Sequence, residues 1–460
     1  MSLAIHPCDA ETVVQNTCEL RLAVLAPRPQ TLEACGLSER FLADLIAKHL
    51  HTAGTLTLAE LADRIALSGP IIEKVLHFMR REARVEIKPR LDGHGTLPYA
   101  LTEHGRNTAL DAFNRSGYVG PAPVPLKDYN EIVAKQSVHD RRVNRAAVRR
   151  ALQGMEISEQ AADQFGISIN SGRPIFIYGP AGTGKSYTTQ KLSGLFREVI
   201  LIPHAVVVDE TVVEVFDPIL HQTVRLEREH SLMLEEGHDP RYAACERPVI
   251  ITGGELTLDL LDVRFEPTTR QYEAPLQLKA NNGMFVIDDL GRQKVAPDAL
   301  FNRWIVPMNE KRDFHALGSG RHFVTPFDVV LVFSSNLHPL DLADEAFLRR
   351  IGHKIYCGYI SPDTYERIWA SICEKEKIKF DPELVHYVIN ELHGRDDKPL
   401  LPCHPKDLIG IAMDKARFTG ADNELTEELL DWAWDTYFVS MEREAGMKRV
   451  GAAQQGVEHG

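Results

Sequence analysis

Eight consecutive residues have the types and the spacing of a phosphate-binding loop, G-x-x-x-x-G-K-[ST]. They are Gly179, Pro180, Ala181, Gly182, Thr183, Gly184, Lys185 and Ser186. Glycine allows backbone angles that other residues avoid, so successive N–H groups can point at phosphate oxygens. We expect Lys185 to hold the β- and γ-phosphates of ATP and Ser186 to bind Mg²⁺.

A phosphate-binding loop lies between a strand and a helix, and the segments on either side of this one predict both. The apolar residues 174–178 predict a buried strand, and residues 187–196 predict a helix. The glycines therefore fall on a strand-to-helix turn. The amino terminus of the helix adds a partial positive charge beside bound phosphates.

A second apolar run, residues 284–287, ends in Asp288 and Asp289. This pattern is typical of a Walker B motif. A strand beside the P-loop strand would carry Asp288 towards Mg²⁺ and place Asp289 where the attacking water is polarised. A third run, residues 329–333, leads to Asn336, whose amide is expected to orient this water.

The composition is that of a globular protein with two or three domains. At 460 residues the chain is too long for one core, and its hydrophobic content of 44% and charged content of 25% are ordinary. The sequence has no run of about 18 uncharged apolar residues, and residues 1–10 lack a basic segment followed by an apolar one. We therefore expect no membrane span and a cytoplasmic location. The seven cysteines form no C-x-x-C pair, which favours reduced thiols.

The net charge of −13 is unevenly distributed along the chain. Residues 1–120 carry 13 basic and 14 acidic side chains, residues 121–150 carry 7 and 3, and residues 151–460 carry 32 and 48. Because an acidic surface repels the phosphate backbone of DNA, this distribution argues against tight non-specific DNA binding by the whole protein.

A proline-rich stretch, residues 121–125, predicts an extended linker that is not packed against the rest of the chain. The segments predicted before it are helices at 39–51, 57–65 and 70–82, strands at 85–87 and 99–102 around a hairpin turn at 92–95, and a helix at 103–115. This order resembles a winged helix, which often binds DNA through its third helix. The basic residues on that helix are Lys74, His77, Arg80 and Arg81. The near-neutral charge of the module favours a protein-docking or structural role over DNA binding.

Residues 139–152 predict a basic helix. Its arginines are Arg141, Arg142, Arg145, Arg149 and Arg150. Positions 142, 145 and 149 share one helical face. Two interpretations stay open: a surface that faces nucleotide or a neighbouring subunit, and a solvated helix, which we favour.

Two further segments complete a recognisable order of motifs. Residues 344–350 are Asp-Glu-Ala-Phe-Leu-Arg-Arg, and residues 404–408, His-Pro-Lys-Asp-Leu, begin a predicted helix. Together with the P-loop, the Walker B motif and the strand before Asn336, they resemble the AAA+ ATPases over about residues 150–440.

This resemblance implies roles for four residues. Asn336 matches sensor 1, Arg349 or Arg350 matches the arginine finger that reaches the neighbouring subunit's nucleotide, and Lys406 matches sensor 2. An arginine supplied by a neighbour makes hydrolysis depend on assembly. The implied active form is a homo-oligomeric ring, most often a hexamer in this family.

Two residues depart from the family's usual pattern. Asp289 stands where most AAA+ proteins have Glu, so its carboxylate is one methylene short. Lys406 stands where Arg is commoner and cannot make a planar two-pronged contact. Slow turnover is therefore expected.

Two insertions indicate which AAA+ ATPases the chain resembles. A helix at 297–308 and a hairpin at 312–327 are similar to the hairpin before sensor 1 in MoxR-type ATPases, which projects towards the centre of the ring. A second insertion, residues 206–254, contains predicted strands at 206–208 and 211–216. The whole module also resembles poorly characterised bacterial AAA+ ATPases described as chaperone-like.

Three polar or aromatic segments have a less definite meaning. Residues 281–283 and 291–293 flank the Walker B motif, either as couplers between nucleotide and hairpin or as simple turns. The aromatic residues near the end are predicted to form the core of a helical lid. They are Trp432, Trp434, Tyr437 and Phe438.

The expected fold class is α/β, a P-loop AAA+ core in which helices flank a parallel sheet. The predicted domains are an N-terminal extension (1–35), a winged-helix-like module (36–120), a linker with the basic helix (121–150), the α/β nucleotide-binding subdomain (151–360), the helical lid (361–445) and a flexible tail (446–460). The leading hypothesis is an ATP-hydrolysing motor or chaperone that remodels or assembles a protein partner. The alternatives are a DNA-acting regulator and a slow-hydrolysing, nucleotide-dependent scaffold.

Overall fold

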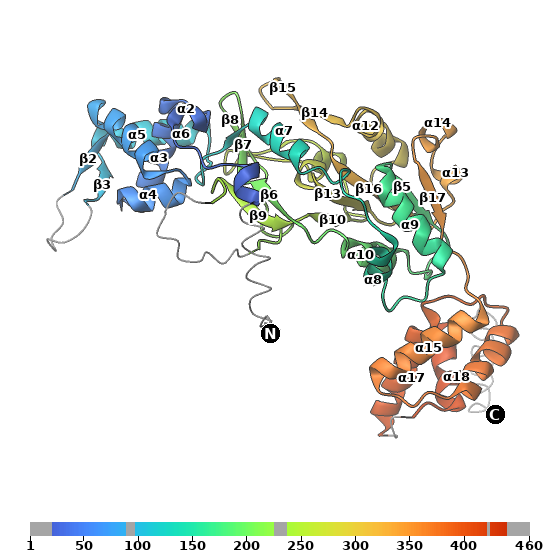
Figure 1. Ribbon diagram of the computed structural model, residues 1–460. Helices are drawn as coiled ribbons and strands as arrows, with labels where there is room; N and C mark the ends of the chain where they lie inside the picture. The colour runs from blue at the N-terminus through green and yellow to red at the C-terminus, as the bar shows by residue number, and fades with distance from the viewer. Residues whose placement is uncertain (1–20, 89–96, 225–236, 421–423, 439–460) are drawn as a thin grey trace, which may run out of the picture. The chain divides into compact units, whose positions relative to one another are not determined.

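The computed structural model describes residues 21–88, 97–224, 237–420 and 424–438 (Figure 1). The chain divides into two compact units. The first unit comprises residues 1–151, 163–176 and 189–354, and the second comprises residues 152–162, 177–188 and 355–460. None of the described helices has the length and apolar character needed to cross a membrane.

The first unit begins with a helical bundle that carries an antiparallel sheet of order β1-β3-β2. The elements of this N-terminal bundle are α3 Glu39–Ala53, β1 Thr55–Leu56, α4 Leu58–Ile65, α5 Gly69–Arg81, β2 Val85–Ile87, β3 Tyr99–Leu101 and α6 Glu103–Arg115. Each predicted helix and strand is found within two residues of its predicted ends, and β1 is an additional strand. The predicted turn at residues 92–95 lies outside the described residues.

The N-terminal bundle packs on a second sheet of the first unit, of order β11-β12-β8-β7-β4. The strands are β4 Val124–Pro125, β7 Ala205–Val208, β8 Thr211–Glu214, β11 Arg264–Glu266 and β12 Gln271–Glu273. The buried core of the bundle continues into Ala205, Val207 and Val212 of this sheet. Lys48 Nζ donates to the carbonyl oxygen of Tyr118 at 2.7 Å, and burial lowers the pKa of Lys48 to about 8.

The expectation of an unpacked linker at residues 121–125 is wrong. Val124–Pro125 form β4, which pairs in parallel with β7. Ala122 and Val124 are fully buried. The bundle and the sheet therefore share one hydrophobic core. Burial of the apolar side chains in this Pro-rich segment favours a packed strand over an exposed linker.

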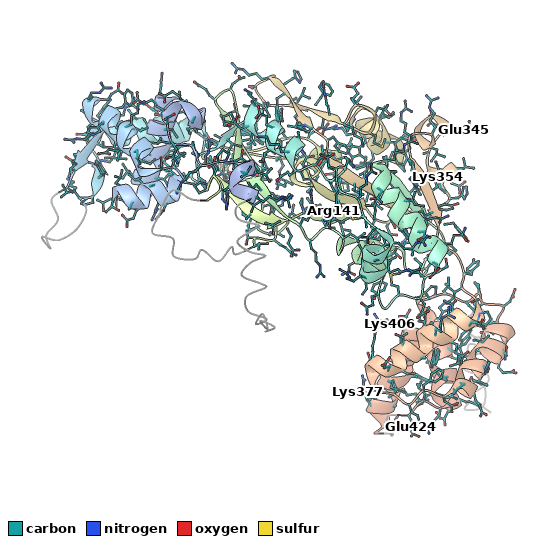
Figure 2. The ribbon with its side chains drawn as sticks, in the orientation of Figure 1. Arg141, Glu345, Lys354, Lys377, Lys406 and Glu424 are labelled. Carbon is teal, nitrogen blue, oxygen red and sulfur yellow. The ribbon has the colours of Figure 1, made fainter. Side chains whose placement is uncertain are left out.

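The predicted basic helix is shorter than expected, since α8 spans Arg145–Ala151. Arg145 donates to both carboxylate oxygens of Asp163, at 2.7 and 2.5 Å. Arg141, labelled in Figure 2, forms an ion pair with Glu198 at 3.5 Å. The Arg145 side chain stays 65% exposed in its pair with Asp163, and Arg142, Arg149 and Arg150 are exposed as well, which agrees with the favoured interpretation of a solvated helix.

The central sheet has the strand order β10-β13-β16-β5-β17. Its strands are β5 Ile175–Tyr178, β10 Val249–Thr252, β13 Gly283–Ile287, β16 Val329–Ser335 and β17 His353–Tyr356. β10, β13 and β16 pair in parallel, and the predicted α/β class is confirmed. One detail differs: β16 lies between β13 and β5, so the carboxylate-bearing strand is not directly beside the P-loop strand.

Aromatic side chains join this sheet to α12, Pro297–Glu310. Trp304 of α12 packs edge-on against Phe285 of β13, with ring centroids 5.8 Å apart, and Phe301 packs against Phe333 of β16 at 6.0 Å. Trp304 and Phe333 are fully buried. Each such aromatic pair adds about 0.5–1.5 kcal/mol beyond the area that it buries, so α12 is firmly fixed on the strands that carry the polar residues.

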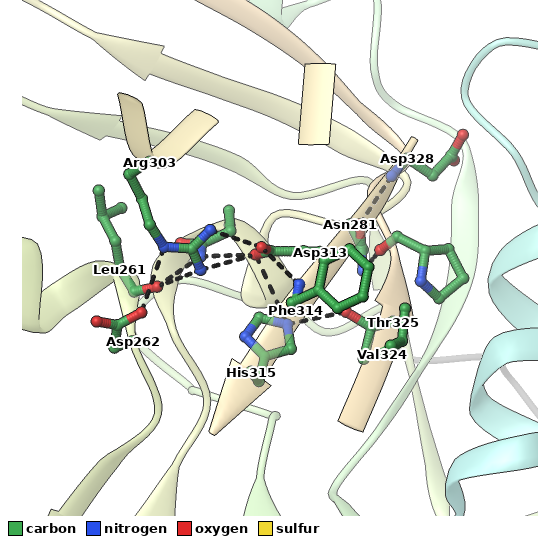
Figure 3. A network of polar contacts seen from close by, with 12 residues as sticks. Leu261, Asp262, Asn281, Arg303, Asp313, Phe314, His315, Val324, Thr325 and Asp328 are labelled. Atoms are coloured by element: carbon green, nitrogen blue, oxygen red, sulfur yellow. Dashed lines mark hydrogen bonds and ion pairs between the residues drawn. The ribbon is translucent and has the colours of Figure 1, made fainter. Parts of the chain in front are cut away.

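The predicted hairpin is formed by β14, Arg312–Ala316, and β15, His322–Pro326, which pair antiparallel. A polar network holds its base to α12 (Figure 3). Arg303 binds the buried carboxylate of Asp313, with Nη1 2.6 Å from Oδ1, and also donates to the carbonyl oxygen of Leu261. These contacts therefore fix the position of the base of the hairpin against α12.

We predict that Asp313→Asn destabilises the protein by about 3 kcal/mol, because it leaves the Arg303 guanidinium largely buried without a full countercharge. Urea unfolding of both proteins measures the change. The matched control is Asp209→Asn, which breaks an exposed ion pair with Arg321 and should change stability by less than about 0.5 kcal/mol. Equal effects of the two substitutions would contradict the structural role of the network.

The carboxyl-terminal part of the second unit is helical. Its elements are α15 Pro362–Glu376, α16 Pro382–Tyr387, the π-helical η2 Val388–His393, α17 His404–Thr419 and α18 Glu427–Tyr437. Trp434 is fully buried in their shared core, as expected. Trp432 is 42% exposed, with Lys415 Nζ 5.2 Å from its ring centre. Its predicted place in the core is therefore wrong, because a position two residues before Trp434 on a helix points to another face.

A buried histidine pair predicts a pH dependence of the second unit. Burial, and to a lesser extent the neighbouring His393, lowers the pKa of His404 from 6.5 to about 4. Between about pH 6.5 and 4, His404 binds a proton in the unfolded chain but stays neutral in the folded chain. The free energy of unfolding should therefore fall as the pH drops through this range. Urea unfolding at pH 7 and 5 measures this fall, and His404→Phe should reduce it. Identical pH dependence in both proteins would contradict the assignment.

Candidate active site

The P-loop, residues 179–186, joins β5 to α10, Lys185–Ser193. Gly179 and Gly182 have φ angles of 148° and 82°. A Cβ at position 179 would stand 1.9 Å from the carbonyl oxygen of Cys357. Glycine is therefore required there both by the backbone angle and by the space.

Lys185 is buried at the first position of α10. Its Nζ donates to the carbonyl oxygens of Gly179 at 2.9 Å and Pro180 at 2.8 Å. The ammonium is thus held inside the curve of the loop, where the same donors fit phosphate oxygens. Ser186 follows as an exposed hydroxyl, an oxygen ligand of the kind that Mg²⁺ prefers. The residues of the loop therefore fit an Mg²⁺-bound nucleotide phosphate.

The second unit also brings the start of α17 to the P-loop. The N–H of Cys403 donates to the carbonyl oxygen of Gly182 at 3.3 Å. Burial raises the pKa of the Cys403 thiol, so the group beside the loop is neutral. Lys406, labelled in Figure 2, lies on the first turn of α17; it is exposed, and the described residues give it no hydrogen bond or ion pair.

Asp288 and Asp289 follow the fully buried strand β13 and are both half-buried. The N–H of Asp288 donates to the carbonyl oxygen of Thr252, at the end of β10. The Asp288 carboxylate accepts the N–H of Asp289 at 3.0 Å, and Asp289 has a φ angle of 50°. The chain therefore turns sharply after β13 and presents two adjacent carboxylates at the edge of the sheet. We call residues 288–293 the carboxylate loop.

Asn336 contacts the second of these carboxylates. Its Nδ2 donates to Asp289 Oδ1 at 2.9 Å. Ser335 Oγ donates to the carbonyl oxygen of Leu290 at 2.6 Å. The ends of β13 and β16 meet at one edge of the sheet, as expected for paired parallel strands, and this brings Asn336 and Asp289 together.

The two candidate finger residues differ in their surroundings. Both follow α14, Glu345–Leu348. Arg350 is half-buried and donates to the carbonyl oxygen of Ala346. Arg349 is exposed and has no hydrogen bond or ion pair among the described residues. Neither arginine makes such a contact with Asp288, Asp289 or Asn336 within the described chain.

Residues 281–283 lie at the opposite end of β13. Asn281 donates to the hydroxyl of Tyr129 at 2.7 Å and accepts the N–H of Asp328 at 3.0 Å; Figure 3 labels Asn281 and Asp328. Asn282 is also buried, and its Nδ2 donates to Asp328 Oδ2. These asparagines support the base of the sheet. Of the second segment, 291–293, Gln293 bonds the main chain of the carboxylate loop to which it belongs.

The comparisons with known proteins cover parts of the chain. A family model described as "Domain of unknown function (DUF8689)" matches residues 361–436. A comparison with curated proteins finds no match. Solved structures also match, at sequence identities of 9–15% in three of them.

Three of those structures illustrate the similarity. The RuvB Holliday junction branch migration motor of Thermotoga maritima has a TM-score of 0.34 and 9% identity, over 61% of this chain and 69% of that one. NtrX of Brucella abortus in complex with ADP has a TM-score of 0.38 and 13% identity, over 71% and 65%. A chain of the complex between subunits BchI and BchD of magnesium chelatase has a TM-score of 0.32 and 15% identity, over 62% and 92%.

We predict that Asp289→Asn lowers ATP turnover at least about 100-fold and changes Mg²⁺-ATP affinity less than about 3-fold. Asparagine tolerates a positive φ and still accepts the hydrogen bond from Asn336, so the substitution removes only the charge. Phosphate release and binding of a fluorescent ATP analogue measure the two quantities. Unchanged turnover would show that this carboxylate does not activate water.

Proposed function

We propose that the chain is an ATP-binding and ATP-hydrolysing AAA+ protein that acts as a homo-oligomeric ring. The observation that carries the proposal is the conformation of the P-loop, with Gly179 and Gly182 at positive φ and the Lys185 ammonium held inside the loop. Bound Mg²⁺-ATP supplies the transferable γ-phosphoryl group. Lys185 would hold its phosphate oxygens, and Ser186 and Asp288 would bind the metal.

In this proposal Asp289 takes the proton from water, and Asn336 holds Asp289 in place through the bond at 2.9 Å. Arg349 is the better candidate for the cation supplied to a neighbouring subunit, since Arg350 is already bound to its own helix. Lys406, at the start of α17, would act on the nucleotide as sensor 2. A cation that arrives only with a neighbour makes hydrolysis depend on assembly.

We further propose a protein client rather than DNA. On α5, which corresponds to the third helix of a winged helix, Lys74 pairs with Glu33 at 3.2 Å and His77 lies 4.0 Å from Glu73. Acidic partners weaken the attraction of these cations for phosphates. The hairpin β14–β15 would transmit the ATPase cycle to the client, as a motor or chaperone.

The experiment that tests the proposed ATPase is phosphate release by the full chain over a range of protein concentrations. Activity per protomer should rise with concentration as rings form. No phosphate release at any concentration would contradict the enzyme, and equal activity per protomer throughout would contradict the shared site. Binding and assembly without turnover would favour the nucleotide-dependent scaffold, for which the short Asp289 side chain is the specific reason.

The DNA alternative is tested by a gel-shift assay at low and high salt. The full chain is the right probe, because the N-terminal bundle shares its core with β7 and β8. DNA binding that weakens steeply with salt would favour a DNA-acting regulator. No binding at low salt would remove that alternative.

A further inference from the structure

The side chain of Gln293 lies among the main-chain atoms of the carboxylate loop. Its Oε1 accepts the N–H of Gly291 at 2.8 Å. Its Nε2 donates to the carbonyl oxygen of Asp288 at 3.0 Å, with longer bonds of 3.3 Å to the carbonyl oxygens of Asp289 and Gly253. One amide thus bonds the main chain of the loop at Asp288 and at Gly291, in the single orientation that matches its donor and acceptor to their partners.

The backbone conformation of the loop explains why such a support is needed. Asp289 and Gly291 have φ angles of 50° and 101°, and a non-glycine residue at positive φ persists only where its surroundings hold it. Bonds to β10 and β16 hold the N–H groups of Asp288 and Leu290. Gln293 donates to the carbonyl oxygens of Asp288 and Asp289, the second of which belongs to the same peptide group as the Leu290 N–H, and its bond to Gly253 links the loop to the residue that follows β10.

We infer that Gln293 is a positioning residue for hydrolysis. It fixes the backbone from which Asp289 projects, so that the Asp289 carboxylate would face the attacking water. Gln293 bonds main-chain carbonyl oxygens and makes no hydrogen bond with the Asp289 carboxylate. The inference rests on the proposed function, because it concerns the rate of ATP hydrolysis. It assigns Gln293 no part in nucleotide binding.

The neighbouring residues provide the contrast that a test needs. Lys294 is exposed next to Gln293 in the sequence, and the described residues give it no hydrogen bond or ion pair. Gln293→Glu keeps the shape and the acceptor for Gly291 but loses the donors to the carbonyl oxygens. Gln293→Ala loses all four bonds. Lys294→Ala changes the same segment without touching the loop's main chain.

The experiment compares these three variants of the full chain with the wild type. We expect Gln293→Ala and Gln293→Glu to lower kcat about 10- to 100-fold and to change affinity for a fluorescent ATP analogue less than about 3-fold. Lys294→Ala should match the wild type. Hydrogen exchange should become faster at Gly291 in Gln293→Ala, with the rest of β13 unchanged.

A double variant separates positioning from a general loss of structure. If Gln293 acts through Asp289, adding Gln293→Ala to Asp289→Asn should cause no further loss in single-turnover rate, because the group to be positioned is already absent. Equal losses in both backgrounds, or wild-type kcat in Gln293→Ala, would overturn the inference while leaving the ATPase intact. A wild-type protein without turnover would instead contradict the proposed function, and the two failures are therefore distinguishable.

Discussion

Lys185→Ala is expected to lower the affinity for Mg²⁺-ATP by at least about 100-fold and to abolish measurable turnover. The Lys185 ammonium is buried within the P-loop and donates to two of its carbonyl oxygens. Alanine removes the only side-chain cation of the loop and leaves the phosphate charge without its partner. Binding of a fluorescent ATP analogue and phosphate release measure both effects.

The control for this variant is Lys127→Ala, which removes an exposed lysine of α7, Leu126–Lys135. It changes the net charge equally and should leave affinity and turnover unchanged. Retention of nucleotide by the Lys185 variant at the wild-type level would contradict the assignment of Lys185 to the phosphates.

Arg349→Ala is expected to reduce turnover about 1,000-fold with less than about a 3-fold change in ATP affinity. The reason is that a finger neutralises charge that develops only as the phosphoryl group is transferred. Arg350→Ala should have the smaller effect, because the Arg350 guanidinium is bound to the carbonyl oxygen of Ala346. Phosphate release at a concentration where rings form measures both variants.

Size-exclusion chromatography provides the control for Arg349→Ala, since the variant must assemble like the wild type for the loss to be chemical. A larger loss in Arg350→Ala than in Arg349→Ala would assign the finger to Arg350. Wild-type turnover in both variants would contradict a finger in this segment.

The local parts of the fold followed from the sequence where the pattern was strong. The apolar runs that became β5, β13 and β16 were predicted closely, and β16 extends two residues beyond its predicted end, through the buried Ser334 and Ser335. Because parallel strands end at one edge, the meeting of Asn336 with Asp289 could be expected as well.

Long-range packing could not be predicted in this way. The position of β16 between β13 and β5 depends on how the strands are arranged in space, which periodicity does not encode. Residues 121–125 have the composition of a linker, yet Ala122 and Val124 are buried because a distant strand, β7, covers them. Residues 291–293 were left between a coupling role and a simple turn, because the contacts of Gln293 depend on a loop conformation that only the folded chain reveals.

The central claim is that one nucleotide is bound by one protomer and completed by the next, and a mixing experiment tests it most directly. Asp289→Asn keeps the finger but lacks the charged carboxylate, and Arg349→Ala keeps the carboxylate but lacks the finger. Phosphate release is measured for each variant alone and for an equal mixture after subunit exchange. Our account predicts that the mixture hydrolyses ATP well above the sum of its parts. Activity equal to that sum, in rings shown to contain both variants and with an active wild type, would contradict it.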